Sequence, residues 1–396
     1  MDTIPYPTDR IRQLTARLIS EEEAIAAAHQ LAHRLRERAD IDRAPISLHE
    51  KCHALAQSGL LAITVPPEYG GIDVSNTILA KVIAILTAAD EHIGEIPRDH
   101  FYILEALRTD GSEEQKSFFL QRTLSGDIFA GKEHDATLSS TLGTRIERDG
   151  LGYRINGRES CSADLASANW IAIFALNEDD KLSLAFVPPG AAGIEKIRNI
   201  SGSAPSDTAI INNTYVQADA VIPHYKGFER PTTICPAGQI IDAGIHLGIA
   251  RARFAETIDV IKALSYPWTV RGKASDDPKT IARVGEIAIR LEAATALVES
   301  AGLKIDIAQV ETTGNSVLAA TLAAAAAQAV TSEIAVQTSD ALRELTDLLF
   351  ANDGAATDGA WRDGCTHAAH DPTRQRYHAV GNFHLNGVTP QASGVF

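Results

Sequence analysis

The chain has 396 residues, of which 45% are hydrophobic and 22% are charged, and its formal net charge is −15. A chain of this length can bury two or three cores, and this composition is typical of a soluble globular protein. The negative charge repels phosphate backbones and anionic lipid head groups, so we expect neither nucleic acid nor a membrane surface as a partner.

The N-terminal sequence MDTIPYPTDR lacks the basic segment and the apolar core of a signal peptide. No segment reaches the roughly 18 apolar residues of a membrane span. The nearest one, VLAATLAAAAAQAV from Val317, is typical of a tightly packed bundle helix. The cysteines are widely spaced and form no CxxC pair, which predicts neither a disulfide framework nor a metal site. We therefore expect a cytoplasmic protein that binds no metal.

Residues 1–125 are predicted to form a helical domain. Ser20 and Glu23 have the spacing of a capping box, in which the side chains satisfy backbone amides at the start of a helix. The apolar residues that follow recur at helical spacing, which gives one buried face. Further helices are expected over residues 49–57 and 76–89, around 100–107, and after Gly111.

Residues 126–230 are predicted to form a β domain. The segments GYRING, NWIAIFAL, KLSLAFVP, IINNTYV and AVIP have β-rich or alternating composition, and turn residues separate them. Residues 231–396 are again predicted to be helical. Long amphipathic helices joined by short connections indicate an up-down bundle, and a longer loop is expected from Tyr266. The chain is thus predicted to be an α+β protein.

This order of elements resembles the acyl-CoA dehydrogenase fold, with an N-terminal helical domain, a central β-barrel or sandwich domain and a C-terminal four-helix bundle. ALAQSGLLAITVPPEYGGIDVS, from Ala54, resembles the N-terminal signature of that superfamily, and ANWIAIFAL resembles the strand after its flavin-contacting loop. HFYILEALRTDGSEEQKSFF from His100, HYKGFERPT from His224 and RDGCTHAAHDPTRQRYHAVGNFHLNGV from Arg362 are similar to the flavin-dependent monooxygenase branch. That branch includes sulfur-acquisition oxidoreductases and dibenzothiophene monooxygenase.

The resemblance implies an enzyme that uses reduced flavin, either FMN or FAD, and O2 to oxygenate a small organic substrate. The substrate class would be a sulfur compound or a biosynthetic intermediate. A separate flavin reductase would supply the cofactor, and the protein would be a homotetramer held together by its helical bundle. The flavin carries the redox chemistry, whereas the protein supplies orientation and proton donors.

Three residues are implied as catalytic by this resemblance. His100 stands where the branch keeps a histidine near the flavin, and a neutral or protonated imidazole there can hydrogen-bond or donate a proton. His370 and Asp371 stand where acyl-CoA dehydrogenases place their catalytic base. Two structural alternatives stay open: His100 as a packed helix histidine, and Asp371, followed by Pro372, as the N-cap of the last helix.

Five residues are implied to contact the cofactor, namely Lys132, Glu133, Ser162, Ala163 and Arg376. Two positions depart from the family pattern, because Cys161 replaces an aromatic residue and Ala163 replaces a threonine. These replacements remove a stacking surface and one hydrogen bond to the flavin ring.

Two alternatives to the monooxygenase are therefore considered. One is a divergent enzyme with weakened or lost flavin binding that uses histidines for acid–base chemistry. The other is a catalytically inactive subunit that stabilises an active relative.

Overall fold

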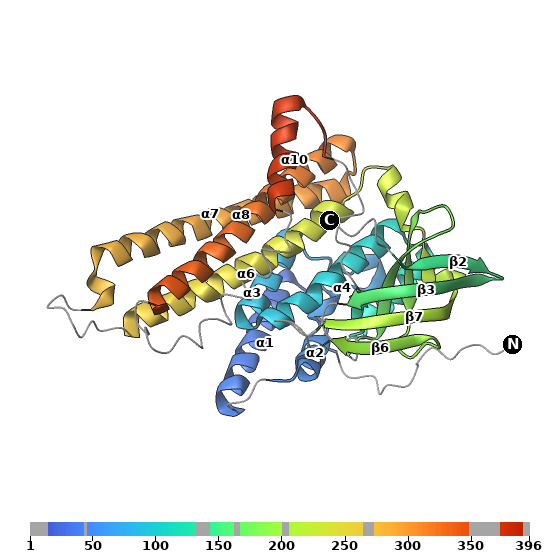
Figure 1. The fold of residues 1–396 in the computed structure, drawn as a ribbon, viewed down its shortest axis with the longest axis horizontal. Coiled ribbons are helices and arrows are strands. Elements are labelled where there is room, and N and C mark those ends of the chain that lie inside the picture. Colours follow the sequence, from blue (N-terminus) through green and yellow to red (C-terminus); the bar gives the residue numbers. More distant parts are fainter. Residues whose placement is uncertain are drawn as a thin grey trace.

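The computed structural model describes residues 15–42, 46–131, 143–161, 167–199, 206–263, 273–347 and 373–390. A layer of N-terminal helices lies between a sheet at one end of the molecule and long helices at the other (Figure 1). This arrangement confirms the predicted α+β class with N-terminal helices, a central sheet and C-terminal helices.

Helices and short 3-10 turns form the region before the sheet. They are α1 (Glu21–Asp42), α2 (Leu48–Gln57), η1 (Leu60–Ala62), η2 (Pro67–Tyr69), α3 (Asn76–Ala89), α4 (Glu91–Asp110) and α5 (Glu113–Leu124). At the start of α1, the Glu23 amide donates to the Ser20 hydroxyl (3.2 Å) and the Glu23 carboxylate accepts from the Ile19 amide (2.9 Å). Helix α4 is longer than predicted and continues through Pro97, because most of its residues are buried against neighbouring elements.

Glycines shape the connection between α2 and α3. Gly59 (φ +78°) precedes η1 and Gly70 (φ +95°) ends η2, both in the left-handed region that glycine adopts without steric cost. At Gly71 the reason is space, since a Cβ there would lie 1.9 Å from the Val65 carbonyl oxygen. In the PPEYGG segment, Gly70 therefore provides the left-handed turn and Gly71 permits close backbone approach.

One sheet contains eight strands in the order β6-β7-β3-β2-β4-β5-β8, with β1 parallel to β4. The strands are β1 (Phe129–Gly131), β2 (Arg145–Asp149), β3 (Gly152–Cys161), β4 (Trp170–Leu176), β5 (Leu182–Val187), β6 (Ile194–Asn199), β7 (Ser206–Gln217) and β8 (Val221–Ile222). The predicted strand segments correspond to β3, β4, β5, β7 and β8. Strands β1, β2 and β6 lie outside the predicted segments; β1 has only three residues, and the sequence of β2, RIERD, is mostly exposed.

The C-terminal bundle contains α6 (Ile234–Ala263), α7 (Pro278–Val310), α8 (Gly314–Asp347) and α10 (Thr373–Asn386). The first three run side by side in Figure 1, and α10 packs on α8. The stretch Gly314–Glu344 of α8 is long and apolar enough to cross a membrane, but 56% of its most apolar window is buried inside the molecule. Its contacts with α6 and α7 identify it as a core helix of the bundle.

Candidate functional site

Strand β1 leads directly into the segment with the predicted flavin contacts. It pairs with β4 in register, from Phe129 opposite Trp170 to Gly131 opposite Ala172. Lys132 and Glu133 continue the chain after β1, and Ser162 and Ala163 follow β3. These four residues lie outside the described part of the chain, so their contacts with flavin stay predictions.

His100 lies in the middle of α4 and is completely buried. Its Nδ1 accepts a hydrogen bond from the Phe129 amide (3.2 Å), and its Nε2 lies 2.9 Å from the Leu61 carbonyl oxygen. Burial lowers the pKa of His100 to about 4, although the Leu61 carbonyl acts in the opposite direction. The imidazole is therefore neutral at physiological pH, with both nitrogens in contact with backbone groups.

A polar stripe runs along one face of the buried N-terminal half of helix α6. Cys235, Gln239, Asp242 and His246 are spaced four, three and four residues apart, so they share a face, and each is less than a tenth exposed. This spacing is visible in the sequence, although none of the four residues is among the predicted site residues.

The stripe is connected to three other helices. Arg98 of α4 forms an ion pair with Asp242 (Nε to Oδ1, 2.8 Å), and Gln328 of α8 donates to Asp242 Oδ2 (3.0 Å). Arg376 of α10 in turn donates from Nε to Gln328 Oε1 (2.8 Å). The predicted cofactor ligand Arg376 is thus held at the junction of α6, α8 and α10.

Burial also sets the protonation of the stripe. It raises the pKa of Cys235 to about 12, against the opposing charge of Arg376, so the thiol stays protonated. It lowers the pKa of His246 to about 4, where Asp242 acts to raise it and Arg98 to lower it further. The stripe therefore presents neutral groups beside one paired carboxylate.

Helix α10 follows the segment that carries the other predicted catalytic residues, and it is held against α8. The Thr373 hydroxyl hydrogen-bonds the Ser332 hydroxyl of α8 (3.2 Å). His370 and Asp371 precede Thr373 and lie outside the described residues, so their catalytic roles also stay predictions.

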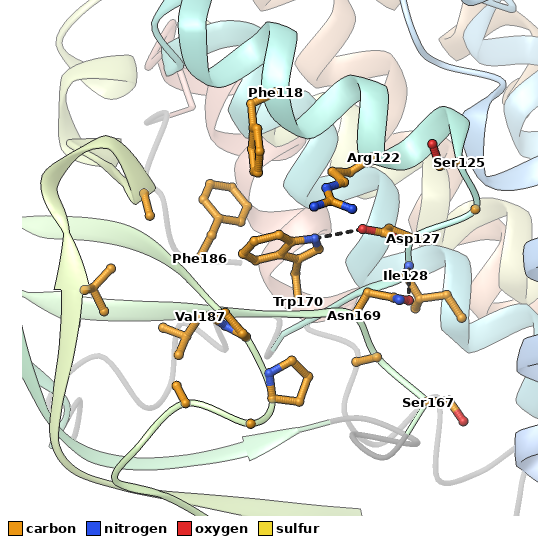
Figure 2. Close-up of a pocket in the computed structure, with 18 of the residues that line it drawn as sticks. Phe118, Arg122, Ser125, Asp127, Ile128, Ser167, Asn169, Trp170, Phe186 and Val187 are labelled. Carbon is orange, nitrogen blue, oxygen red and sulfur yellow. Dashed lines mark hydrogen bonds between the residues drawn. The ribbon is translucent and has the colours of Figure 1, made fainter. Parts of the chain in front are cut away.

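A separate cavity of about 1980 Å³ lies between α2, α5 and the sheet. Figure 2 shows Phe118, Trp170 and Phe186 around it, with Arg122 and Asp127 nearby. Trp170 donates from Nε1 to Asp127 (3.0 Å), and the Arg122 guanidinium lies 5.5 Å from the centre of the Phe118 ring. Only Phe118 among these rings is substantially exposed, so the cavity combines one accessible aromatic ring with a cation and a carboxylate.

None of the predicted site residues is among the described residues that line this cavity. Its walls come from elements far apart in the chain, so no local sequence pattern indicates it. Ile128 and Ser167 each lie four residues from a predicted flavin contact, and the Ser167 hydroxyl is 3.0 Å from His49 Nδ1 of α2.

The fold and the matched segments define a protein of the acyl-CoA dehydrogenase type. The family models "Acyl-CoA dehydrogenase, N-terminal domain" and "Acyl-CoA dehydrogenase, C-terminal domain" match residues 13–127 and 240–374. The chain belongs to the acyl-CoA dehydrogenase superfamily.

The similarity to individual relatives extends over nearly the whole chain. Dibenzothiophene monooxygenase from Rhodococcus erythropolis is 25% identical over 94% of this chain and 95% of that protein. The probable FMNH2-dependent monooxygenase SfnC from Pseudomonas putida is 25% identical over 86% and 89%. The structure of dibenzothiophene monooxygenase TdsC from Paenibacillus sp. A11-2, with FMN and indole, superposes with a TM-score of 0.85 at 24% identity, covering 95% of this chain and 100% of that one.

Proposed function

We propose that this protein is a flavin-dependent monooxygenase that uses reduced flavin and O2 to oxygenate a small organic molecule in the cytoplasm. The observation that carries the proposal is the similarity to dibenzothiophene monooxygenase, which extends over 94% of this chain. Relatives that are named as monooxygenases support redox chemistry over an inactive subunit or a non-redox enzyme. A separate flavin reductase would supply the reduced cofactor.

FMN is the proposed flavin, because the names of SfnC and the TdsC complex specify FMNH2 and FMN. We assign its contacts to Lys132, Glu133, Ser162, Ala163 and Arg376. Bound reduced flavin would supply the electrons that activate O2. Arg376 fits this role in the described structure, because its side chain is fixed by Gln328 and carries a permanent charge suited to a phosphate or a polar ring edge.

The polar stripe of α6 is the proposed substrate wall. The Gln239 side-chain oxygen is buried and has no hydrogen-bond partner among the described residues. A buried acceptor without a partner costs about 1–3 kcal/mol, and a ligand with an N–H or O–H group would recover that cost. This supports a substrate, or an oxygenated product, that donates a hydrogen bond at this wall.

We assign acid–base chemistry to His370 with Asp371, at the family's position for the catalytic base. For His100, proton transfer to a ligand would require that one of its two backbone hydrogen bonds break. The geometry therefore does not favour the predicted catalytic role of His100.

The proposed homotetramer has a candidate contact surface on α7. Ile289, Leu303 and Val310 are 72%, 60% and 91% exposed. Successive members are fourteen and seven residues apart and thus share one helix face, with Ile307 beside them. An exposed apolar stripe of this kind is typical of an interface, and we propose that a second copy of the chain covers it.

Flavin binding tests the proposed function. The purified protein is titrated with FMN and FAD, oxidised and chemically reduced, and binding is followed by fluorescence and absorbance. We expect reduced FMN to bind with micromolar or better affinity, and NADH-driven oxygenation to require an added reductase. No binding of any of the four species at high micromolar concentration would overturn the proposal.

A further inference from the structure

We infer that His100 is a positioning residue whose imidazole joins turn η1 to strand β1, and that it does not exchange a proton during turnover. The expected effect on flavin affinity rests on the proposed function, whereas the hydrogen-bonded connection between η1 and β1 does not. The inference assigns a role different from the catalytic one that the family resemblance implies.

The hydrogen bonds define the tautomer of the ring. The Phe129 amide can only donate, so Nδ1 must be the unprotonated acceptor (3.2 Å). Nε2 then carries the hydrogen and donates it to the Leu61 carbonyl (2.9 Å). One neutral tautomer satisfies both contacts, whereas a doubly protonated ring would place two donors against each other at Nδ1.

The surroundings give the ring no access to a reacting molecule in this conformation. His100 has no exposed surface, and the rings of Phe101 and Phe129 lie 5.4 and 5.5 Å from it, centre to centre. If the imidazole turned towards a ligand, it would leave a buried backbone amide or carbonyl unpaired, which proteins rarely tolerate.

The position of the contact explains why it matters for the site. Immediately before β1, the Ile128 carbonyl accepts from the Trp170 amide of β4 on one edge (3.2 Å). The next amide, that of Phe129, points to the opposite edge, where His100 accepts it. Among the described strands only β4 pairs with β1, so His100 occupies the place of a strand partner on the α4 side.

Strand β1 has only three residues and is followed at once by Lys132 and Glu133. So short a strand makes few ladder hydrogen bonds. One further hydrogen bond, from the Phe129 amide to His100, therefore makes the strand considerably better ordered. His100 thus determines how firmly the proposed flavin segment is held at its start.

Three variants of the full-length protein separate the two hydrogen bonds. His100→Phe keeps a ring of similar size but forms neither bond. His100→Asn places an amide oxygen near the Nδ1 position and can still accept from Phe129. His100→Gln places an amide N–H near the Nε2 position and can still donate to Leu61.

Hydrogen–deuterium exchange measured by mass spectrometry provides the first readout and needs no flavin. We expect faster exchange in peptides that cover β1 for His100→Phe and His100→Gln, and near-wild-type exchange for His100→Asn. If His100→Phe does not fold, the comparison of Asn with Gln gives the same test. Equal exchange of β1 in the Asn and Gln variants would overturn the inference.

FMN affinity and the pH profile of kcat provide the second readout. Loss of one hydrogen bond corresponds to roughly a tenfold change in an equilibrium constant, so we expect FMN to bind about tenfold more weakly to His100→Gln than to His100→Asn. The shape of the kcat–pH profile should be the same in His100→Asn as in wild type. Loss of one limb of that profile with unchanged FMN affinity would assign proton transfer to His100 instead.

These readouts distinguish the inference from the proposed function. If wild-type protein bound no flavin, the proposed function would fail, and the exchange experiment would still decide whether His100 connects η1 to β1.

Discussion

Gln328 of α8 donates a hydrogen bond to Asp242 of α6 (Nε2 to Oδ2, 3.0 Å), and both side chains are buried. The same carboxylate pairs with Arg98 of α4, and Gln328 accepts from Arg376 of α10. Four helices that are distant in sequence are therefore connected through one carboxylate and one amide.

Asp242→Leu should destabilise the protein, because it removes the partner of Arg98 and one partner of Gln328. Breaking a buried pair costs about 3–5 kcal/mol, and since the Arg98 side chain is 34% exposed we expect about 1–3 kcal/mol. Chemical denaturation measures the change. Asp259→Leu, on the exposed side of the same helix, is the control and should change stability by less than about 0.5 kcal/mol. Equal effects of the two substitutions would contradict a structural role for the network.

Stability should fall as the pH decreases from 6.5 towards 4. His100 and His246 each have a pKa of about 4 in the folded state, compared with an ordinary value of 6.5, because burial disfavours the charged ring. Between these values the unfolded chain binds the protons and the folded chain does not, so protonation favours unfolding.

The slope from these two groups reaches at most about 2.7 kcal/mol per pH unit. The charged groups facing His246 are Asp242 and Arg98, whereas burial is the dominant influence on His100. Denaturant midpoints at pH 7.5, 6 and 5 measure the effect. Replacement of His246 by Gln should make the dependence shallower, and an unchanged slope would mean that His246 does not titrate in this range.

Gly71→Ala and Gly285→Ala form a pair with opposite expected signs. A Cβ at Gly71 would lie 1.9 Å from the Val65 carbonyl oxygen, so the backbone must move and we expect a loss of several degrees in Tm. At Gly285, inside α7, a Cβ meets nothing within 4 Å, and alanine should stabilise the helix by about 0.5–1 kcal/mol. Thermal unfolding of both variants measures the two changes in Tm. Destabilisation by Gly285→Ala would indicate that a neighbouring subunit covers Gly285.

Gln239→Leu should preserve or raise the stability of the ligand-free protein and weaken substrate binding. The substitution removes a buried oxygen that has no partner in the described structure, and leucine fills a similar volume. We expect KM to rise about tenfold for a substrate that donates a hydrogen bond at this wall. Phe118→Ala, in the separate cavity of Figure 2, should leave KM unchanged. A raised KM for Phe118→Ala with an unchanged KM for Gln239→Leu would place the substrate in that cavity.

Ile289→Asp and Leu303→Asp should dissociate the proposed assembly. Both residues are large, apolar and exposed on one face of α7, so a carboxylate would be buried there only if a second copy covers the face. Light scattering after size-exclusion chromatography measures the mass. Leu151→Asp, at a position that is 94% exposed outside the bundle, is the matched control. A mass that is unchanged in both α7 variants would exclude this face as the interface.

Local sequence determined a large part of the fold. Ser20 and Glu23 signalled the start of α1, and the apolar period predicted α3 over its full length. Each of these features depends on residues within one or two turns of one another, so their physical cause is present in the local sequence. The family resemblance placed these elements in the correct order.

Tertiary structure alone decided what the buried polar groups contact. The sequence indicated that His100 is chemically capable of proton transfer, but its two partners come from segments 39 and 29 residues away. Likewise, Asp242 and Gln328 are 86 residues apart. Whether a histidine or a carboxylate is reactive or structural depends on burial and on the geometry of such distant partners. Local composition and periodicity describe neither, because these contacts exist only once the helices and the sheet have packed together.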